Sequence, residues 1–213
     1  MSRATAAFPL AWQAQSILVS YPGEELPGRL PLLRDVASAA GARAGRPLHR
    51  FLDHAARTPL PDLAADYVAT FDHHKRCCLF LTYYFYGDTR KRGVALLRLK
   101  QTYAAAGLRL TEDELPDHLA VVLEFASIAG VSAGRDLLGQ HRAGLELLRL
   151  ALKEAVSPWA DVLESVSATL PPLSGGERQA VARLAAEGPP EEQVGLAPFA
   201  PPEYMPQPRG GPR

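Results

Sequence analysis

The feature that most constrains this chain is a succession of short amphipathic segments separated by proline, glycine and helix-capping residues. The clearest one follows Ser157-Pro158 and carries apolar side chains at the spacing of one helix face. Composition agrees, because 34 Ala and 32 Leu stand against 12 Val, 2 Ile and 8 Thr. Ala and Leu are strong helix formers, whereas β-branched residues favour strands. The sequence therefore predicts an all-α fold. The apolar side chains of the segment after Pro158 are Trp159, Val162, Leu163, Val166 and Leu170.

Helix start and stop signals divide the chain into about eight or nine helices of one bundle-like domain. Asp88 is a good N-cap, and two capping boxes, Thr111 with Glu114 and Ser174 with Glu177, predict further starts. The predicted stops are Tyr21-Pro22-Gly23, Gly41 and Gly107. The expected helices cover residues 10–20, 24–40, a short segment with Pro47 in its first turn, 77–86, 89–106, 111–129, 133–155, 159–170 and 174–187.

Two of these helices carry specific expectations. Residues 133–155 should bury Leu137, Leu145 and His141 and expose Arg135, Arg142 and Arg149. Residues 77–86, CCLFLTYYFY, suit a buried strand as well as a buried helix. We expect a helix there, because no other segment has the pattern of a strand that would pair with it.

The domain is expected to span residues 1–187 and to be followed by a tail at residues 188–213. That tail holds 8 Pro and 4 Gly in 26 positions and should be disordered or an extended linker. No apolar run is long enough to cross a bilayer, and the start lacks the basic and apolar regions of a secretory signal. Adjacent cysteines rarely form a disulfide. We therefore expect a cytoplasmic protein with reduced thiols.

The segment HHKRCC offers two histidines and two cysteines, the residue types that bind zinc. Four ligands from six consecutive helical residues cannot converge tetrahedrally, because adjacent side chains point about 100° apart. We expect His73 and His74 on the surface and Cys77 and Cys78 as small core residues. No metal and no cofactor are predicted.

A basic cluster begins at Arg90-Lys91-Arg92 and continues with Arg98 and Lys100. It suggests an alternative function, a helical module that binds nucleic acid or a phosphate ligand. Against this, the formal net charge is zero, so the long-range field of a nucleic-acid binder is missing. A solvated helix face is the preferred interpretation.

An acidic group lies near the start of the apolar segment 111–129. Asp117 and Glu124 are seven residues apart, which places them on one stripe of a mostly buried helix, facing a groove, water or a cation. His118 beside them lies in the positive first turn, which favours a neutral ring. The aromatic residues of the run 80–86 complete a surface that would suit a basic amphipathic peptide. Glu112, Asp113 and Glu114 are the other acidic residues of this group.

The same stretches resemble the NarJ family of respiratory nitrate reductase assembly chaperones, also called delta subunits. The resemblance rests on YVATFD from residue 67, LTYYFYGDTRKRG from residue 81 and LPDHLAVVLEFAS from residue 115. Agreement is weaker in the opening ILVSYP segment at residues 17–22.

The resemblance implies an all-helical, cytoplasmic, non-catalytic chaperone. Its expected partners are the N-terminal peptide of the catalytic alpha subunit and the apo-enzyme complex, which it holds open for molybdenum cofactor insertion before membrane docking. No nucleic acid partner and no membrane insertion are expected. Together with the acidic stripe, the family motifs assign peptide contact to Tyr84, Gly87, Asp88, Arg90, Pro116, Asp117, His118 and Glu124.

Overall fold

Helices provide nearly all the regular structure of the computed structural model, which describes residues 7–111 and 114–188. The predicted all-α class is confirmed, but within those residues there are eleven α-helices and one 3-10 turn, more than the eight or nine expected. The α-helices are α2 (Phe8–Val19), α3 (Leu26–Ala39), α4 (Gly41–Arg57), α5 (Leu60–Phe71), α6 (Tyr83–Tyr86), α7 (Arg90–Ala105), α8 (Leu119–Ala129), α9 (Val131–Gln140), α10 (Arg142–Glu154), α11 (Trp159–Thr169) and α12 (Gly175–Glu187); the 3-10 turn η1 is Lys75–Cys77.

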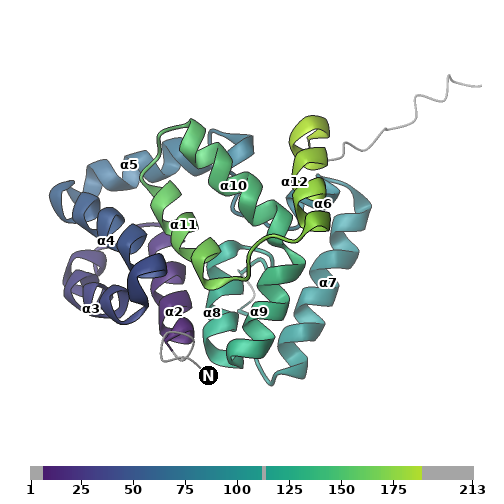
Figure 1. Cartoon of the computed structure of the whole chain (residues 1–213), viewed down its shortest axis with the longest axis horizontal. Coiled ribbons are helices and arrows are strands. Elements are labelled where there is room, and N and C mark those ends of the chain that lie inside the picture. Colours follow the sequence, from purple (N-terminus) through teal and green to yellow (C-terminus); the bar gives the residue numbers. More distant parts are fainter. Residues whose placement is uncertain (1–6, 112–113, 189–213) are drawn as a thin grey trace, which may run out of the picture.

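Helix α2 lies at the centre of the packing. It contacts α8, α11 and α3, with α3 to α5 on one side of the view and α7 to α9 on the other (Figure 1). Its Trp12 is fully buried, and the indole N–H donates to Thr169 Oγ1 at 2.9 Å. In return Trp159 of α11 donates to the carbonyl of Leu18 at 3.0 Å. Two tryptophans thus bury large apolar areas while each indole N–H is satisfied.

Helices α3 and α4 meet at a tight corner. Ala40 is both the C-cap of α3 and the N-cap of α4, so α4 begins directly after it at Gly41. Gly41 adopts φ +80°, a conformation that favours glycine. The predicted stop at Gly41 is confirmed. The predicted helix with Pro47 in its first turn is wrong in its start, because α4 begins at Gly41 and Pro47 lies inside it.

Residues 77–86 do not form one helix. Cys77 ends η1, and residues 78–82 are not helical. Phe80 forms an isolated antiparallel bridge with His118, flanked by hydrogen bonds from Leu81 N to Asp117 O at 2.9 Å and from Leu119 N to Leu79 O at 2.8 Å. The expectation failed because the pairing partner is a single residue before α8, which no strand pattern in the sequence reveals.

The predicted helix 111–129 begins at Leu119 instead, with His118 as its N-cap. Thr111 does donate to Glu114, from both its N–H and its hydroxyl, but residues 114 and 115 are not helical. Residues 112 and 113 lie outside the described part. Asp117 therefore precedes the helix, and the shared stripe of Asp117 and Glu124 does not exist.

The predicted helix 133–155 is broken at His141, where φ is −103° and ψ is 13°. The break gives the two halves different partners, since α9 packs on α8 while α10 packs on α11 and α12. As a result Arg142, expected in solvent, is 5% exposed.

Helix caps were predicted with mixed success. The Ser174 and Glu177 capping box is present in full. The N-cap of α7 is Thr89, one residue after the predicted Asp88. Helix α5 was not expected at all. The proposed tail falls almost wholly on residues 189–213, outside the described part of the chain. None of the described helices is both long and apolar enough to cross a membrane.

The α3/α4 packing predicts opposite effects for two glycine substitutions. A Cβ on Gly45 would lie 2.1 Å from the carbonyl oxygen of Ala37, which is backbone and cannot rotate away. Gly45→Ala should therefore lower the free energy of unfolding by about 2 kcal/mol or more. A Cβ on Gly28 in α3 would meet nothing within 4 Å. Gly28→Ala should stabilise the protein by about 0.5 to 1 kcal/mol. Urea unfolding measures both, and a neutral Gly45→Ala would contradict the close approach.

Candidate functional site

The predicted site is organised around the carboxylate of Asp117, which is completely buried. One of its oxygens, Oδ2, accepts hydrogen bonds from the hydroxyl and the N–H of Thr82, the latter at 3.3 Å. Arg92 Nη2 lies 3.4 Å from the same oxygen and forms an ion pair with it. A buried carboxylate needs such donors and a cation. Asp117 is therefore an internal cross-link between the segment at Thr82, α7 and the start of α8.

Arg92 extends this cross-link to the surface. Its Nη1 donates to Asp88 at 3.1 Å, its Nε donates to Thr82 Oγ1 at 3.3 Å, and its guanidinium lies 5.5 Å from the centroid of the Phe80 ring. The sequence interpretation placed Arg92 in a solvated basic cluster. In the structure its side chain is only 18% exposed. The alternative nucleic-acid module thus loses one of its cations to internal packing, and Arg90, Lys91, Arg98 and Lys100 remain exposed.

His118 is half-buried and caps α8. Its Nδ1 accepts from the N–H of Ala120 at 3.3 Å, which requires the unprotonated nitrogen, and its ring packs edge-on against Phe80 at 5.3 Å. Burial lowers the pKa of His118, although the carboxylates of Asp117 and Glu114 act in the opposite direction. The acceptor role of Nδ1 and the lowered pKa both favour the neutral ring expected from the sequence, although the main cause is desolvation and not a position in the first helical turn.

The other predicted peptide contacts are mostly internal. Tyr84 is 4% exposed, and its hydroxyl is directed at the carbonyls of Arg76 and Cys78. Pro116 is buried, and its carbonyl accepts from Tyr103 at 2.6 Å. Gly87, also buried, turns the chain with φ +54°. Asp88 and Arg90 are exposed beside it.

Glu124 belongs to a different place, a pocket between α2, α3 and α8. This acidic pocket has a volume of about 260 Å3. Glu124 is exposed there and forms no ion pair within the described residues, whereas Glu25 pairs with Arg29 at 3.9 Å. The lining of the pocket also includes the apolar or aromatic side chains of Ile17, Tyr21 and Leu26. The residues that matter for recognition are Ile17, Tyr21, Leu26, Glu25, Arg29 and Glu124.

The acidic pocket brings together two stretches that are distant in sequence. Ile17 to Pro22 ends α2 and begins the turn to α3, while Glu124 comes from the middle of α8. An unpaired carboxylate beside apolar and aromatic side chains suits a cationic amphipathic segment. The sequence analysis identified Glu124 as acidic and accessible but placed it beside Asp117. It did not identify the roles of Thr82 and Tyr21 or the inward direction of the Arg92 side chain.

The HHKRCC segment does not gather a ligand set. His73 and His74 are exposed, Cys77 is buried and Cys78 half-buried, and both thiols are free. Burial raises the pKa of both thiols. Across residues 7–111 and 114–188, no three His, Cys, Asp or Glu side chains lie close enough together to hold a metal ion.

Comparison with known proteins gives consistent matches. A profile of the family described as "Nitrate reductase delta subunit" matches residues 35–164, which contain the whole Asp117 network and Glu124. The chain is 36% identical over 163 residues to the "Probable nitrate reductase molybdenum cofactor assembly chaperone NarJ" of Bacillus subtilis (strain 168), covering 76% of this chain and 88% of that protein.

Two further relatives extend the comparison. The "Probable nitrate reductase molybdenum cofactor assembly chaperone NarW" of Escherichia coli (strain K12) is 29% identical over 150 residues, which cover 70% of this chain and 63% of NarW. The "Nitrate reductase-like protein NarX" of Mycobacterium tuberculosis (strain ATCC 25618 / H37Rv) is 36% identical over 160 residues, which cover 75% of this chain and 24% of NarX. The chain thus corresponds to a part of that longer protein.

The Asp117 network predicts unequal effects of removing its two carboxylates. Asp117→Asn removes the charge that pairs with Arg92 and should lower the free energy of unfolding by about 2 kcal/mol. Asp88→Asn is the matched control, because Asp88 pairs with the same Arg92 but its side chain is 80% exposed. Its loss should be below about 0.5 kcal/mol. Chemical denaturation measures both, and equal losses would contradict a structural role for Asp117.

The lowered pKa values of His118 and His141 predict how the free energy of unfolding depends on pH. Burial lowers the pKa of His118 and of His141 below 6.5, against the attraction of Asp117. The unfolded state therefore binds protons more readily than the folded state. The contribution of the two histidines to the free energy of unfolding is complete above their unfolded pKa and is lost as pH falls below that value. Unfolding free energy should drop between about pH 7.5 and about pH 5.5.

A double variant tests the assignment. His118→Gln with His141→Gln should flatten this drop, since neither glutamine titrates. Asp53, Glu164 and Glu177 also have lowered pKa values, but they begin to titrate near 4.5 or below, outside the window. An unchanged drop in the double variant would show that other groups cause it.

Proposed function

Because the chain belongs to the nitrate reductase delta subunit family, we propose that it is a cytoplasmic, non-catalytic chaperone for the assembly of respiratory nitrate reductase. It binds the N-terminal segment of the catalytic alpha subunit and keeps the apo-enzyme complex open for molybdenum cofactor insertion before membrane docking. The matches to the NarJ and NarW chaperones support the assembly role.

The observation that carries leader binding is the exposed Glu124 of the acidic pocket, which forms no ion pair with the residues that the structure describes. A Lys or Arg of the leader pairs with Glu124, while apolar leader residues contact Ile17, Tyr21 and Leu26. Such an ion pair at a partly covered surface is stronger than one in open solvent, since the peptide displaces water from around it. The peptide site thus includes Glu124 and Tyr21 as direct contacts.

The remaining predicted residues have two kinds of role in this proposal. Tyr84, Gly87, Pro116 and Asp117 hold the segments around Thr82 and α8 in place, because their side chains or backbone groups are buried. Asp88, Arg90 and His118 are accessible or half-buried on that side of the molecule and provide a second contact with the apo-enzyme.

Calorimetric titration of the alpha-subunit N-terminal peptide tests this function. Glu124→Gln should weaken binding about fivefold, the effect of losing roughly 1 kcal/mol of charge-assisted hydrogen bonding. Glu187→Gln is the matched control, because Glu187 is exposed on α12 and does not line the acidic pocket. Its affinity should equal that of the wild type.

The titrations distinguish an error in the location of the peptide site from an error in the leader-binding role itself. Equal affinity of Glu124→Gln and wild type, with Tyr21→Ala also unchanged, would place the peptide elsewhere on the molecule. Absence of binding to the wild type would refute the leader-binding role.

A further inference from the structure

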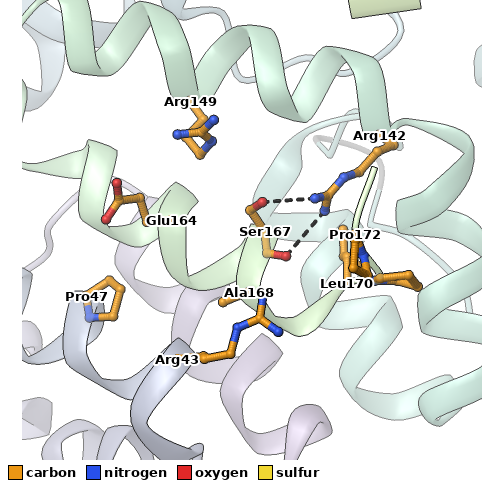
Figure 2. A pocket seen from close by; sticks show the side chains of 10 residues that line it. Arg43, Pro47, Arg142, Arg149, Glu164, Ser167, Ala168, Leu170 and Pro172 are labelled. Carbon is orange, nitrogen blue, oxygen red and sulfur yellow. Dashed lines mark hydrogen bonds between the residues drawn. The ribbon is translucent and has the colours of Figure 1, made fainter. Parts of the chain in front are cut away.

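A second pocket contains a concentration of arginines that leader binding does not use. It lies between α4, α10, α11 and the segment after α11, and its volume is about 260 Å3. Figure 2 shows the side chains of Arg43, Arg142 and Arg149 arranged around Ser167, with Glu164 on one side and Leu170 and Pro172 on the other. We call it the arginine pocket.

Arg142 forms the buried wall of the arginine pocket. Its side chain is 6% exposed and donates to the carbonyl and the hydroxyl of Ser167, at 3.4 and 3.0 Å (Figure 2). Its Nε is buried and has no hydrogen-bond partner among residues 7–111 and 114–188. Loss of water on burial lowers the pKa of this guanidinium, although the carboxylates of Glu146 and Glu177 act in the opposite direction. The pocket therefore already contains an incompletely satisfied cation.

Only one buried carboxylate serves both inner arginines. Glu146 is 3% exposed, pairs with Arg142 at 3.0 Å and accepts from Arg149 Nε at 2.7 Å. It also accepts from the Ser167 hydroxyl at 2.7 Å. A single negative charge is thus shared between two guanidiniums, which leaves Arg149 with nitrogens that make no hydrogen bond to the described residues.

Arg43 adds a third guanidinium that has no internal partner. It is exposed on α4 and forms neither a hydrogen bond nor an ion pair in the part of the chain that the structure describes. Glu164 at the same pocket is already engaged by Arg50 and Lys153. The local group has five cations and four carboxylates, an excess of one positive charge. Its members are Arg43, Arg50, Arg142, Arg149 and Lys153 with Glu146, Asp161, Glu164 and Glu177.

The size and lining of the pocket indicate what kind of anion fits. Several guanidiniums on one pocket favour phosphate, because its oxygens accept paired N–H donors from several directions. The volume is close to the lower end of small-molecule pockets, about 300 Å3, and is several times the share of one water molecule, about 30 Å3. Apolar surface from Pro47, Leu170 and Pro172 lies beside the arginines.

We propose that the arginine pocket binds the phosphate group of a small phosphate ester, with Arg43, Arg142 and Arg149 on the phosphate and the organic part against Pro47, Leu170 and Pro172. This site is distinct from the exposed basic face of α7 and does not depend on leader-peptide binding.

Isothermal titration with glycerol 3-phosphate and with orthophosphate, at constant ionic strength, tests the proposal. Wild type should bind glycerol 3-phosphate saturably and more tightly than orthophosphate, because the three-carbon chain of the ester adds contacts with the pocket wall. Arg43→Gln should weaken binding about tenfold. It should leave folding unchanged, since Arg43 is exposed and forms no hydrogen bond or ion pair with the described residues. Arg46→Gln is the matched control, an exposed arginine of the same helix that does not line the pocket, and should bind like wild type.

Several results would overturn the proposal. No saturable binding of either probe up to about 10 mM, or equal affinity of Arg43→Gln and wild type, would show that the pocket is not a phosphate site. Equal binding of acetate would assign the pocket to carboxylates instead. Equal affinities for the two phosphates would show that free phosphate, and not an ester, is the ligand class.

Discussion

The structure depends on one buried carboxylate. Asp117 lies where the non-helical segment around Phe80, the start of α7 and the start of α8 meet, and its side chain is fully buried. Thr82 and Arg92 contact its Oδ2, while Oδ1 has no hydrogen-bond partner among the described residues. An ionised carboxylate tolerates burial only when donors and a cation surround it. Thr82 and Arg92 therefore have to be in place for α8 to begin at Leu119. The bridge between Phe80 and His118 and the internal position of Pro116 follow from the same arrangement.

The parts of the fold that depend on local signals were predictable. The apolar stripe of α11 and the capping box at Ser174 depend on side chains that are at most four residues apart in sequence, and both occur as expected. The segment around Phe80 was not predictable in this way, since its partner His118 is 38 residues away and forms a single bridge. Breaks such as the one at His141 are decided by which neighbours the two halves pack against, and periodicity continues smoothly through them.

The candidate site was predictable in composition more than in place. Family motifs and charge drew attention to Asp117 and Glu124. Asp117 is fully buried in a hydrogen-bond network, and Glu124 lines the acidic pocket. Their roles differ because α8 starts later than expected, so that Asp117 is turned into the core while Glu124 is exposed at the acidic pocket. The contribution of Tyr21 depends on α2 and α3 packing beside α8, a relation that no single segment contains.

The hydrogen bonds of α2 also set an order of events during synthesis. Trp12 and Gln15 find their side-chain partners, Thr169 and Ser165, 157 and 150 residues later in the chain. At a translation rate of about 5 to 20 residues per second, roughly 8 to 30 seconds pass between the two. During that time the face of α2 that finally contacts α11 lacks its native partner, and the nascent protein completes its core only when α11 leaves the ribosome.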